Sequence, residues 1–349
     1  MSAISAAIQR AVQANADGLE AFAAGNAERA TELLRLAYRL HPDELGILVN
    51  LGLAFMQRGL VEPAEHCYRL AVRSPELRVQ RSAAKNLGFL KLWCGAWQEG
   101  WHWHGQRFRG EAFLGTQWKG EPLNGQPLTV WNDVGMGDAF QFVRYTQPLV
   151  ERGERVVLAV ERSQIALLRE QLAWPLADVI DRSVVDRSAG PHIPLMSLIG
   201  LLDPSTSWGR SFQGPTFIAP PSPAPPQAIG LCWASNPNDR TMHAYKSCTA
   251  ERLLELQQAT AGEPLSLQTN ETAAHERLKL EPAVPDWQHS WGQLGRCRRV
   301  LSVDTAVAHL SAGSGIPLTL LLGPVPDWRW QQPQAGLWYP QLELASLTP

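Results

Sequence analysis

The chain has 349 residues, of which 45% are hydrophobic and 18% charged, a composition typical of folded globular proteins and unlike that of disordered chains. Its net charge of -2 gives no electrostatic basis for nucleic-acid binding, so we expect no nucleic-acid partner. No apolar run reaches the roughly 18 residues of a membrane-spanning helix, and the N-terminus lacks a secretion signal, so we expect a cytoplasmic protein without a transmembrane segment.

The cysteines are few and scattered. There are five, an odd number, with no CxxC pair, which indicates reduced, mostly buried thiols. The sequence also contains no Asp-x-Asp motif and no His/Cys cluster with the spacing of metal ligands. We therefore expect neither a bound metal nor a cofactor.

The first hundred residues show an internal repeat. Three apolar positions recur 34 residues later in the same order: Ala30, Leu34 and Ala37, then Ala64, Tyr68 and Ala71. Pro42 and Pro75 are placed to stop the second helix of each unit. This pattern resembles the tetratricopeptide repeat, whose period is 34 residues, while a generic helical bundle is the alternative. Repeats of this kind usually stack into a surface that binds a partner.

Beyond residue 112 the pattern changes to short apolar runs that alternate with amphipathic stretches. In chain order the pattern predicts strand Leu128–Trp131, helix Ala139–Glu151, strand Arg155–Val160, helix 162–172, strand Ile229–Trp233, helix Ala250–Gln258, strand Pro264–Gln268, strand Arg299–Val303, helix Thr305–Gly313 and strand Leu318–Leu322. A proline-rich segment, 215–226, interrupts the alternation and fits an interdomain linker. The sequence thus predicts an α + α/β protein: a helical module at 1–112 and two Rossmann-like lobes at 113–222 and 223–349.

A Gly-Met-Gly-Asp sequence at residues 135–138 follows the first predicted strand. Its glycines permit a tight turn and close approach to a ligand, but it lacks the third glycine of a GxGxxG dinucleotide motif. Asp138 fits two interpretations. It is either a helix N-cap or a carboxylate at the floor of a cleft, placed to take a proton from an acceptor hydroxyl.

Two further groups of residues carry possible chemistry. Asp304 and Thr305 lie where a strand gives way to a helix, and His309 follows one helical turn later. Such a helix start suits a diphosphate, although an Asp/Thr cap with a packed histidine explains the same residues. The polar loop 234–240 continues to Lys246, and it fits either the delivery of a cation to a phosphate or an ordinary solvated loop.

Several motifs, in order, resemble one bacterial family. They are VWNDVGMGDAFQFVRY at 130–145, HIPLMSL at 192–198, SVDTAVAHLSAGSG at 302–315, PDWRW at 326–330 and WYP at 338–340, preceded by a bridge at 97–125. The resemblance is to tetratricopeptide-repeat proteins with a GT-B glycosyltransferase domain related to lipopolysaccharide heptosyltransferases. It implies that Asp138 is the catalytic base and that Asp304, Thr305 and His309 contact the phosphates of a nucleotide sugar, assisted by Lys246.

The chain departs from that family at two places. Asp133-Val134-Gly135 stands where the family has Glu-Gln-Gly, and the family's Asn-Asp-Arg-x-Arg-Ser loop is only partly present at 238–247. The chain also ends soon after its WYP motif. These departures leave a second reading open: a GT-B/TPR scaffold with weak or no catalysis that acts as a protein-binding module.

We therefore expect an inverting, metal-independent glycosyltransferase, with nucleotide-sugar turnover as the observation that separates it from the scaffold. The sugar would pass from a nucleotide-sugar donor to a protein or glycan acceptor that the repeats recruit. We assign catalysis to Asp138. The residues assigned to donor binding are Gly137, Trp233, Asn236, Lys246, Gln268, Asp304, Thr305, Ala306 and His309.

Overall fold

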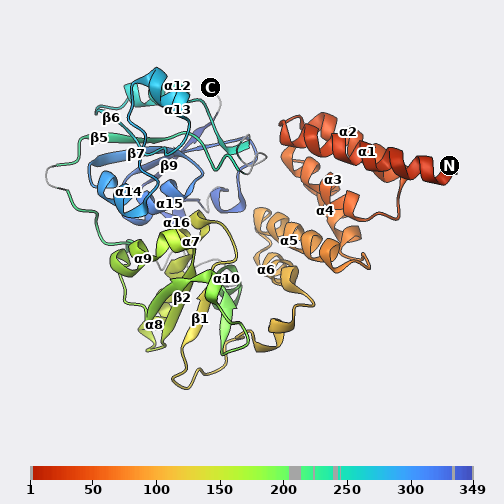
Figure 1. The fold of residues 1–349 in the computed structure, drawn as a ribbon, viewed down its shortest axis with the longest axis horizontal. Helices are drawn as coiled ribbons and strands as arrows, with labels where there is room; N and C mark the ends of the chain where they lie inside the picture. Colours follow the sequence, from red (N-terminus) through yellow and green to blue (C-terminus); the bar gives the residue numbers. More distant parts are fainter. Residues whose placement is uncertain are drawn as a thin grey trace. The chain divides into compact units, whose positions relative to one another are not determined.

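The structure, a computed structural model, describes residues 3–203, 214–222, 225–238, 243, 245–331 and 335–347 (Figure 1). The chain forms two compact units. The helical unit comprises Met1–Leu114, Asn236–Tyr245 and Val325–Gln331, and the sheet unit comprises Gly115–Ser235, Lys246–Pro324 and Gln332–Pro349. Among the described residues, no helix combines the length and the apolar character needed to cross a bilayer.

The helical unit is built from three successive pairs of helices, each packed against the next. Their bounds are α1 Ala3–Ala23 and α2 Ala27–Leu40, α3 Gly46–Gln57 and α4 Val61–Ala71, and α5 Leu77–Trp93 and α6 Trp97–Gly105. Short 3-10 turns follow at Gln106–Phe108 and Ala112–Thr116. Leu34 and Tyr68, which the period placed in equivalent positions, are 0% and 1% exposed and belong to one core shared by α2 to α5. The predicted helical character of this region is confirmed.

Glycines recur at the same two places in every helix pair. One lies inside the first helix, where a Cβ would come within 2.8 Å of the facing helix: Gly18, Gly52 and Gly88. The other lies in the turn between the two helices with a left-handed φ of 70° to 77°: Gly25, Gly59 and Gly95. Only glycine adopts that φ without strain. The three pairs are therefore one helix–turn–helix arrangement repeated.

A segment from the far end of the sequence completes this unit. Trp328, within the 3-10 turn Trp328–Trp330, packs edge-on against Trp101 of α6 with 5.6 Å between ring centroids. Trp93 Nε1 donates to the Pro326 carbonyl at 3.0 Å. Because Trp328 is only 2% exposed, its ring is part of the apolar core at the α5–α6 end of the unit.

The first sheet of the sheet unit is parallel, with strand order β3-β2-β1-β4. Its strands are β1 Leu128–Trp131, β2 Val156–Val160, β3 Asp178–Asp181 and β4 His192–Pro194. Its helices are α7 Met136–Phe142, α8 Gln147–Glu151, α9 Ile165–Gln171 and α10 Leu195–Leu202, with 3-10 turns at Val143–Thr146, Arg162–Gln164 and Arg182–Val184. The nearly continuous apolar run of β2 is typical of a strand covered on both faces.

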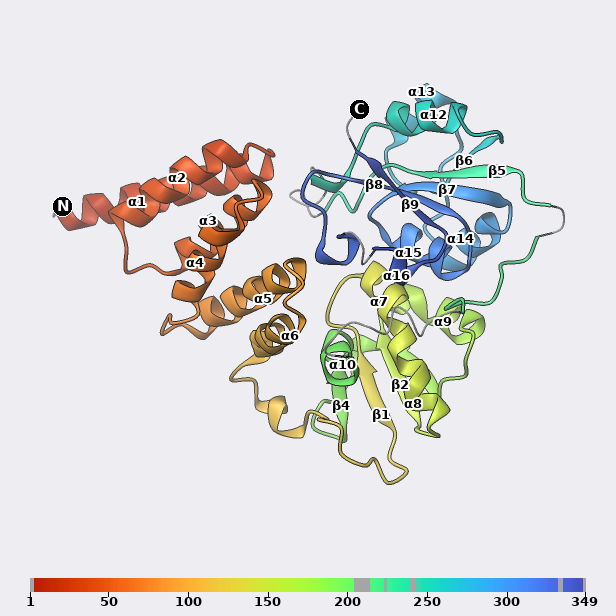
Figure 2. The ribbon, with the colours of Figure 1, turned by 180° about the vertical axis from the view of Figure 1, so that it is seen from behind.

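The second sheet is also parallel, with strand order β6-β5-β7-β8-β9. Its strands are β5 Ala228–Cys232, β6 Pro264–Ser266, β7 Cys297–Val303, β8 Leu318–Leu322 and β9 Leu342–Ser346. Its helices are α12 Ala250–Gln258, α13 Thr272–Leu278, α14 Trp287–Leu294, α15 Ala306–Gly313 and α16 Ala335–Trp338. The expected alternation of strands and helices in parallel sheets is confirmed, and α7 and α15 lie side by side between the sheets (Figures 1 and 2).

Two predicted elements differ from the structure in ways that matter for the site. The helix expected at 139–151 begins earlier, at Met136, and divides into α7, a 3-10 turn and α8. Pro148 in the first turn of α8 has no N–H to continue the hydrogen-bond ladder of a single helix. The strand expected at Ile229–Trp233 lies one residue earlier, so Trp233 belongs to the loop that follows β5.

The beginning of the proline-rich segment is packed, whereas most of its other described residues are exposed. Phe217 is fully buried, with its ring 5.9 Å from Phe140 of α7 and 6.1 Å from Trp291 of α14. Its backbone N–H, and that of Thr216, donate to the Gly313 carbonyl. Thr216 and Phe217, which lie between the two sheets in sequence, therefore belong to the core of the sheet unit.

Candidate functional site

Both sheets have a topological switch point, where the order of strands reverses. In the first sheet β2 and β3 lie on one side of β1 and β4 on the other; in the second, β6 lies on one side of β5 and β7 on the other. Ligands of open parallel sheets bind outside the carboxyl ends of the strands at such points. The loops that follow β1, β5 and β7 are therefore the natural place for a site. They carry most of the residues that the sequence singled out.

Asp138 stabilises the turn that begins α7. Its Oδ2 accepts a hydrogen bond from Gly135 N at 3.0 Å. The N-cap residue is Gly135, so Asp138 is the third residue of the helix and not the N-cap that one interpretation expected. A carboxylate here also interacts favourably with the helix dipole. Asp138 thus has a structural role, which does not exclude proton transfer, since a carboxylate offers two oxygens.

The N-termini of α7 and α15 meet at Gly137. A Cβ on Gly137 would lie 3.0 Å from His309 Cδ2 and 3.2 Å from Ala306 Cα, closer than ordinary van der Waals contact. The missing side chain therefore allows the two helices to approach. Gly137 and Ala306, both predicted to bind a donor, are the residues that bring the first turn of α7 next to the first turn of α15.

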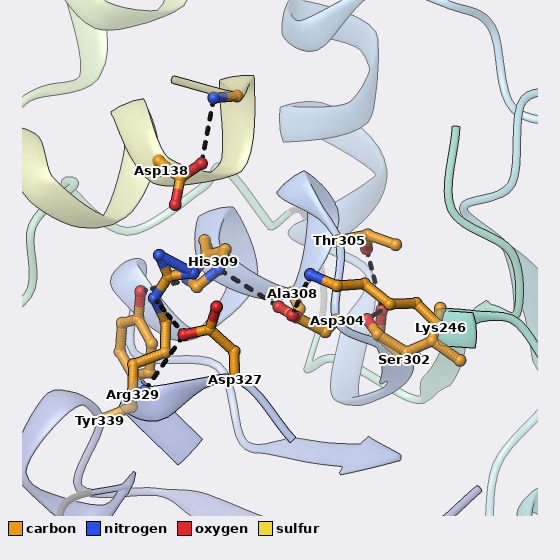
Figure 3. Close-up of polar contacts among 12 residues, drawn as sticks. Asp138, Lys246, Ser302, Asp304, Thr305, Ala308, His309, Asp327, Arg329 and Tyr339 are labelled. Carbon is orange, nitrogen blue, oxygen red and sulfur yellow. Dashed lines mark hydrogen bonds and ion pairs between the residues drawn. The ribbon is translucent and has the colours of Figure 1, made fainter. Parts of the chain in front are cut away.

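Asp304 is the centre of a charged cluster at the start of α15 (Figure 3). Its Oδ2 accepts a hydrogen bond from Lys246 Nζ at 2.5 Å, and its Oδ1 lies 3.6 Å from His309 Nε2. Asp304 and His309 are 8% and 3% exposed. Such a carboxylate needs these partners, because an unpaired buried charge costs several kcal/mol. The structure thus brings Lys246 to Asp304 and His309, which the sequence had already placed together at one strand–helix junction.

Thr305 begins α15 with an extended backbone, φ -137° and ψ 172°, but its side chain does not cap the helix. Its Oγ1 lies 3.2 Å from Ser302 Oγ and 3.7 Å from Cys232 Sγ. Burial raises the pKa of the Cys232 thiol, so this sulfur is a neutral neighbour. The start of α15, with its N–H groups and the nearby Lys246 ammonium, is suited to an anion such as a diphosphate.

Gln268 and Trp233 have buried side chains that organise the loop after β5. Gln268 Oε1 accepts hydrogen bonds from Trp233 N at 3.1 Å and Ala234 N at 3.0 Å. The Trp233 ring is 2% exposed and lies 4.9 Å from the ring of His275. These contacts set the conformation of the loop backbone. A contribution of either residue to ligand binding would therefore come through that backbone.

Asn236 is exposed and belongs to the helical unit. Its Oδ1 accepts a hydrogen bond from Asn238 N at 3.0 Å, which closes a local turn. Within the predicted loop from 234 to Lys246, residues 239–242 and 244 lie outside the described residues. The structure thus brings Lys246 into the cluster around Asp304.

Two residues of the site were missed from the sequence. Tyr339 Oη lies 3.0 Å from His309 Nδ1, and the Arg144 guanidinium lies 4.9 Å from the centre of the Tyr339 ring. Both occur within motifs of the sequence analysis, Arg144 in FQFVRY and Tyr339 in WYP, and membership of these motifs is the signal that could have found them. Their contact with each other and with His309 depends on the tertiary fold.

No family model and no curated protein sequence matches the chain. Among solved structures, the chain is similar to the dodecameric iron-containing heptosyltransferase TibC in complex with ADP-D-beta-D-heptose, with a TM-score of 0.45, 11% identity, and coverage of 65% of this chain and 64% of TibC. A second TibC structure, from enterotoxigenic E. coli H10407, gives a TM-score of 0.43, 11% identity and 63% coverage of both chains.

The third similar structure is a mutant O-GlcNAc transferase of Thermobaculum terrenum. Its TM-score is 0.30 at 13% identity, with coverage of 98% of this chain and 88% of that one. The chain spans less than two thirds of the length of TibC. A structural similarity with TM-scores below 0.5 and identities of 11–13% assigns neither family nor activity.

Proposed function

We propose that this chain is a glycosyltransferase that moves a sugar from a nucleotide-sugar donor to an acceptor, with inversion at the anomeric carbon. The observation that carries the proposal is the Lys246–Asp304–His309 cluster at the start of α15, against which the first turn of α7 with Asp138 packs. In-line displacement needs a base for the acceptor hydroxyl and stabilisation of the leaving diphosphate. The two adjoining helix starts supply groups of both kinds.

The donor side of the proposed site uses cations and N–H groups. On binding, the Lys246 ammonium would exchange part of its contact with Asp304 for a phosphate oxygen. The Thr305 hydroxyl, His309 and the first N–H groups of α15 would hold the remaining oxygens. Since these groups act in ground and transition states alike, their removal should weaken donor binding first.

We propose that transfer needs no metal ion, because these groups offset the diphosphate charge. In the parts of the chain that the structure describes, no cluster of three or more His, Cys, Asp or Glu side chains is arranged to hold a metal. Full activity after treatment with EDTA is the expected result. Loss of activity on EDTA treatment, with recovery on adding manganese or iron, would overturn the metal-independent mechanism.

The acceptor is proposed to be a protein or a glycan held by the helical unit, with residues 1–112 as a tetratricopeptide-type module and 113–222 and 223–349 as the two lobes of a GT-B fold. A hollow of about 490 Å³ is lined by residues of α1, α3 and α5. Ile8, Val12 and Leu19 on its wall are 38%, 63% and 38% exposed. Exposed apolar side chains around a concavity support the binding of a partner there.

The deciding experiment is calorimetric binding of a panel of nucleotide sugars, beside a transfer assay with the bound donor. Asp138→Asn should lower kcat by about 10²–10⁴-fold with donor affinity little changed. His309→Ala should weaken nucleotide binding instead. Full activity in Asp138→Asn would remove this residue from catalysis, and unchanged affinity in His309→Ala would place the donor elsewhere.

One observation favours the alternative, a scaffold without catalysis. The charges of the proposed site are already bonded internally: Lys246 to Asp304, and Asp138 to Gly135. If these bonds do not open for a ligand, the fold serves only to bind proteins. Absence of binding for every nucleotide sugar in the panel would make the scaffold the better description.

A further inference from the structure

Each ring nitrogen of His309 lies near one polar group, Nε2 near Asp304 and Nδ1 near Tyr339. His309 Nε2 lies 3.6 Å from Asp304 Oδ1, and a carboxylate that is ionised can only accept. A proton on Nε2 therefore fits this neighbour, whereas a lone pair there would face the negative charge. In the neutral imidazole, Nδ1 is then the acceptor. The hydroxyl of Tyr339, 3.0 Å away, can donate to it.

Tyr339 is itself held in place by a buried arginine. Arg144 is 3% exposed, with its guanidinium over the Tyr339 ring at 4.9 Å from the centroid. It donates to the carbonyl of the preceding residue, Trp338, at 2.8 Å, and to Thr216 Oγ1 at 3.1 Å. Arg144 lies in the 3-10 turn after α7. It therefore connects the helices of the first sheet to Tyr339, which directly follows α16. Arg144 thus holds the ring of Tyr339, while the hydroxyl of Tyr339 faces His309.

We infer that Tyr339 and Arg144 are positioning residues of the donor site, which hold His309 in its Nε2–H form. This inference rests on the proposed function. In this form Nε2–H and the Lys246 ammonium are two donors that share the Asp304 carboxylate before a ligand arrives (Figure 3). A diphosphate oxygen beside Asp304 can then accept from both without any proton being taken up or lost. Fixed donors of this kind cost little reorganisation when charge develops on the leaving group.

The first test needs no ligand. Nitrogen-15 NMR of the imidazoles in the full chain, with His309 assigned from a His309→Gln variant, reports the tautomer directly. We expect the Nε2–H form in the unmodified protein and a measurable share of the Nδ1–H form in Tyr339→Phe, which deletes only the hydroxyl. Tyr68→Phe, a matched buried tyrosine in the helical unit, should leave the His309 signals unchanged. An Nδ1–H form in the unmodified protein, or identical spectra in Tyr339→Phe, would overturn the inference.

The second test asks whether the tautomer matters for the donor. Tyr339→Phe should weaken nucleotide-sugar binding by about 3–10-fold, the usual range for one hydrogen bond. In a His309→Gln background the same substitution should have no further effect, because the two residues would act through one contact. Additive losses would show that Tyr339 acts independently of His309. If the unmodified protein bound no nucleotide sugar, the proposed function would fail, while the NMR result would still decide the tautomer.

Discussion

Replacing Gly137 with alanine tests whether the approach of α7 and α15 is as close as the site requires. The new Cβ would lie 3.0 Å from His309 Cδ2, 3.2 Å from Ala306 Cα and 3.3 Å from Ala306 N. Two of these atoms are backbone and cannot rotate away. Overpacking of this kind typically costs about 1–3 kcal/mol, while alanine gains at most about 1 kcal/mol over glycine in a helix. The net effect is a loss of about 0–2 kcal/mol.

Gly292 in α14 is the matched control. It is also a helical glycine, but a Cβ there would meet nothing within 4 Å. Gly292→Ala should therefore raise the calorimetric melting temperature by about 2–4 °C, as expected for about 1 kcal/mol in a unit of this size. Gly137→Ala should leave it unchanged or lower it by up to about 8 °C, and should weaken nucleotide binding. Equal stabilisation by both substitutions would refute the close contact.

Three further predictions concern the helical unit and the thiols. Trp328→Ala should destabilise the protein by about 3–5 kcal/mol, because it empties a site in the core next to α6; a melting temperature within 1–2 °C of the unmodified protein would contradict this packing. Burial raises the pKa of Glu65, but Lys91 and Arg69 outweigh burial and the net pKa is lowered. The Glu65 carboxylate therefore stabilises the fold above its unfolded pKa, and this contribution is lost as the pH falls through its folded pKa. Between about pH 6 and about pH 3, the free energy of unfolding should depend less on pH in Lys91→Met than in the unmodified protein. A thiol reagent at about pH 8 should modify Cys94 before Cys297. Cys94 is exposed, whereas Cys297 is buried and burial raises its pKa to about 12.

The parts of the fold that the sequence predicted well are those with strong local signals. Strands β1 and β8 and helix α12 have the predicted bounds, because each is an apolar or amphipathic run between clear turn residues. Strands β3, β4 and β9 were not predicted. β4 has only three residues and ends in a proline, and β9 is an edge strand whose residues are not fully buried. Each of these strands forms by hydrogen bonding to a neighbouring strand, β3 to β2, β4 to β1 and β9 to β8, and its own sequence carries only a weak strand signal.

Among the site residues, too, those that lie close together in sequence were easier to predict than those brought together by the fold. Asp304, Thr305 and His309 were predicted because they lie close in sequence at a strand–helix junction. Lys246 reaches Asp304 across 58 residues. The loop chemistry suggested a cation for a phosphate, but only the family resemblance placed Lys246 in the same site as Asp304. Contacts of this kind are set by the switch point between β5 and β7, which brings two distant loops to one edge of the sheet. Period and spacing within a short window carry no information about such a pairing.

Asp138 is not the N-cap, but its structural role at the helix start is compatible with the proposed catalytic one. A catalytic carboxylate must be fixed within fractions of an ångström, and a hydrogen bond to one of its oxygens is a common way to achieve this. Gly135 N donates to Oδ2, so this hydrogen bond orients the carboxyl group that the proposed reaction needs. Substitution by asparagine separates the two roles, because the amide oxygen can still accept from Gly135 N while the group can no longer take a proton. A protein that keeps its melting temperature and loses turnover would then assign the loss to proton transfer and not to the helix start.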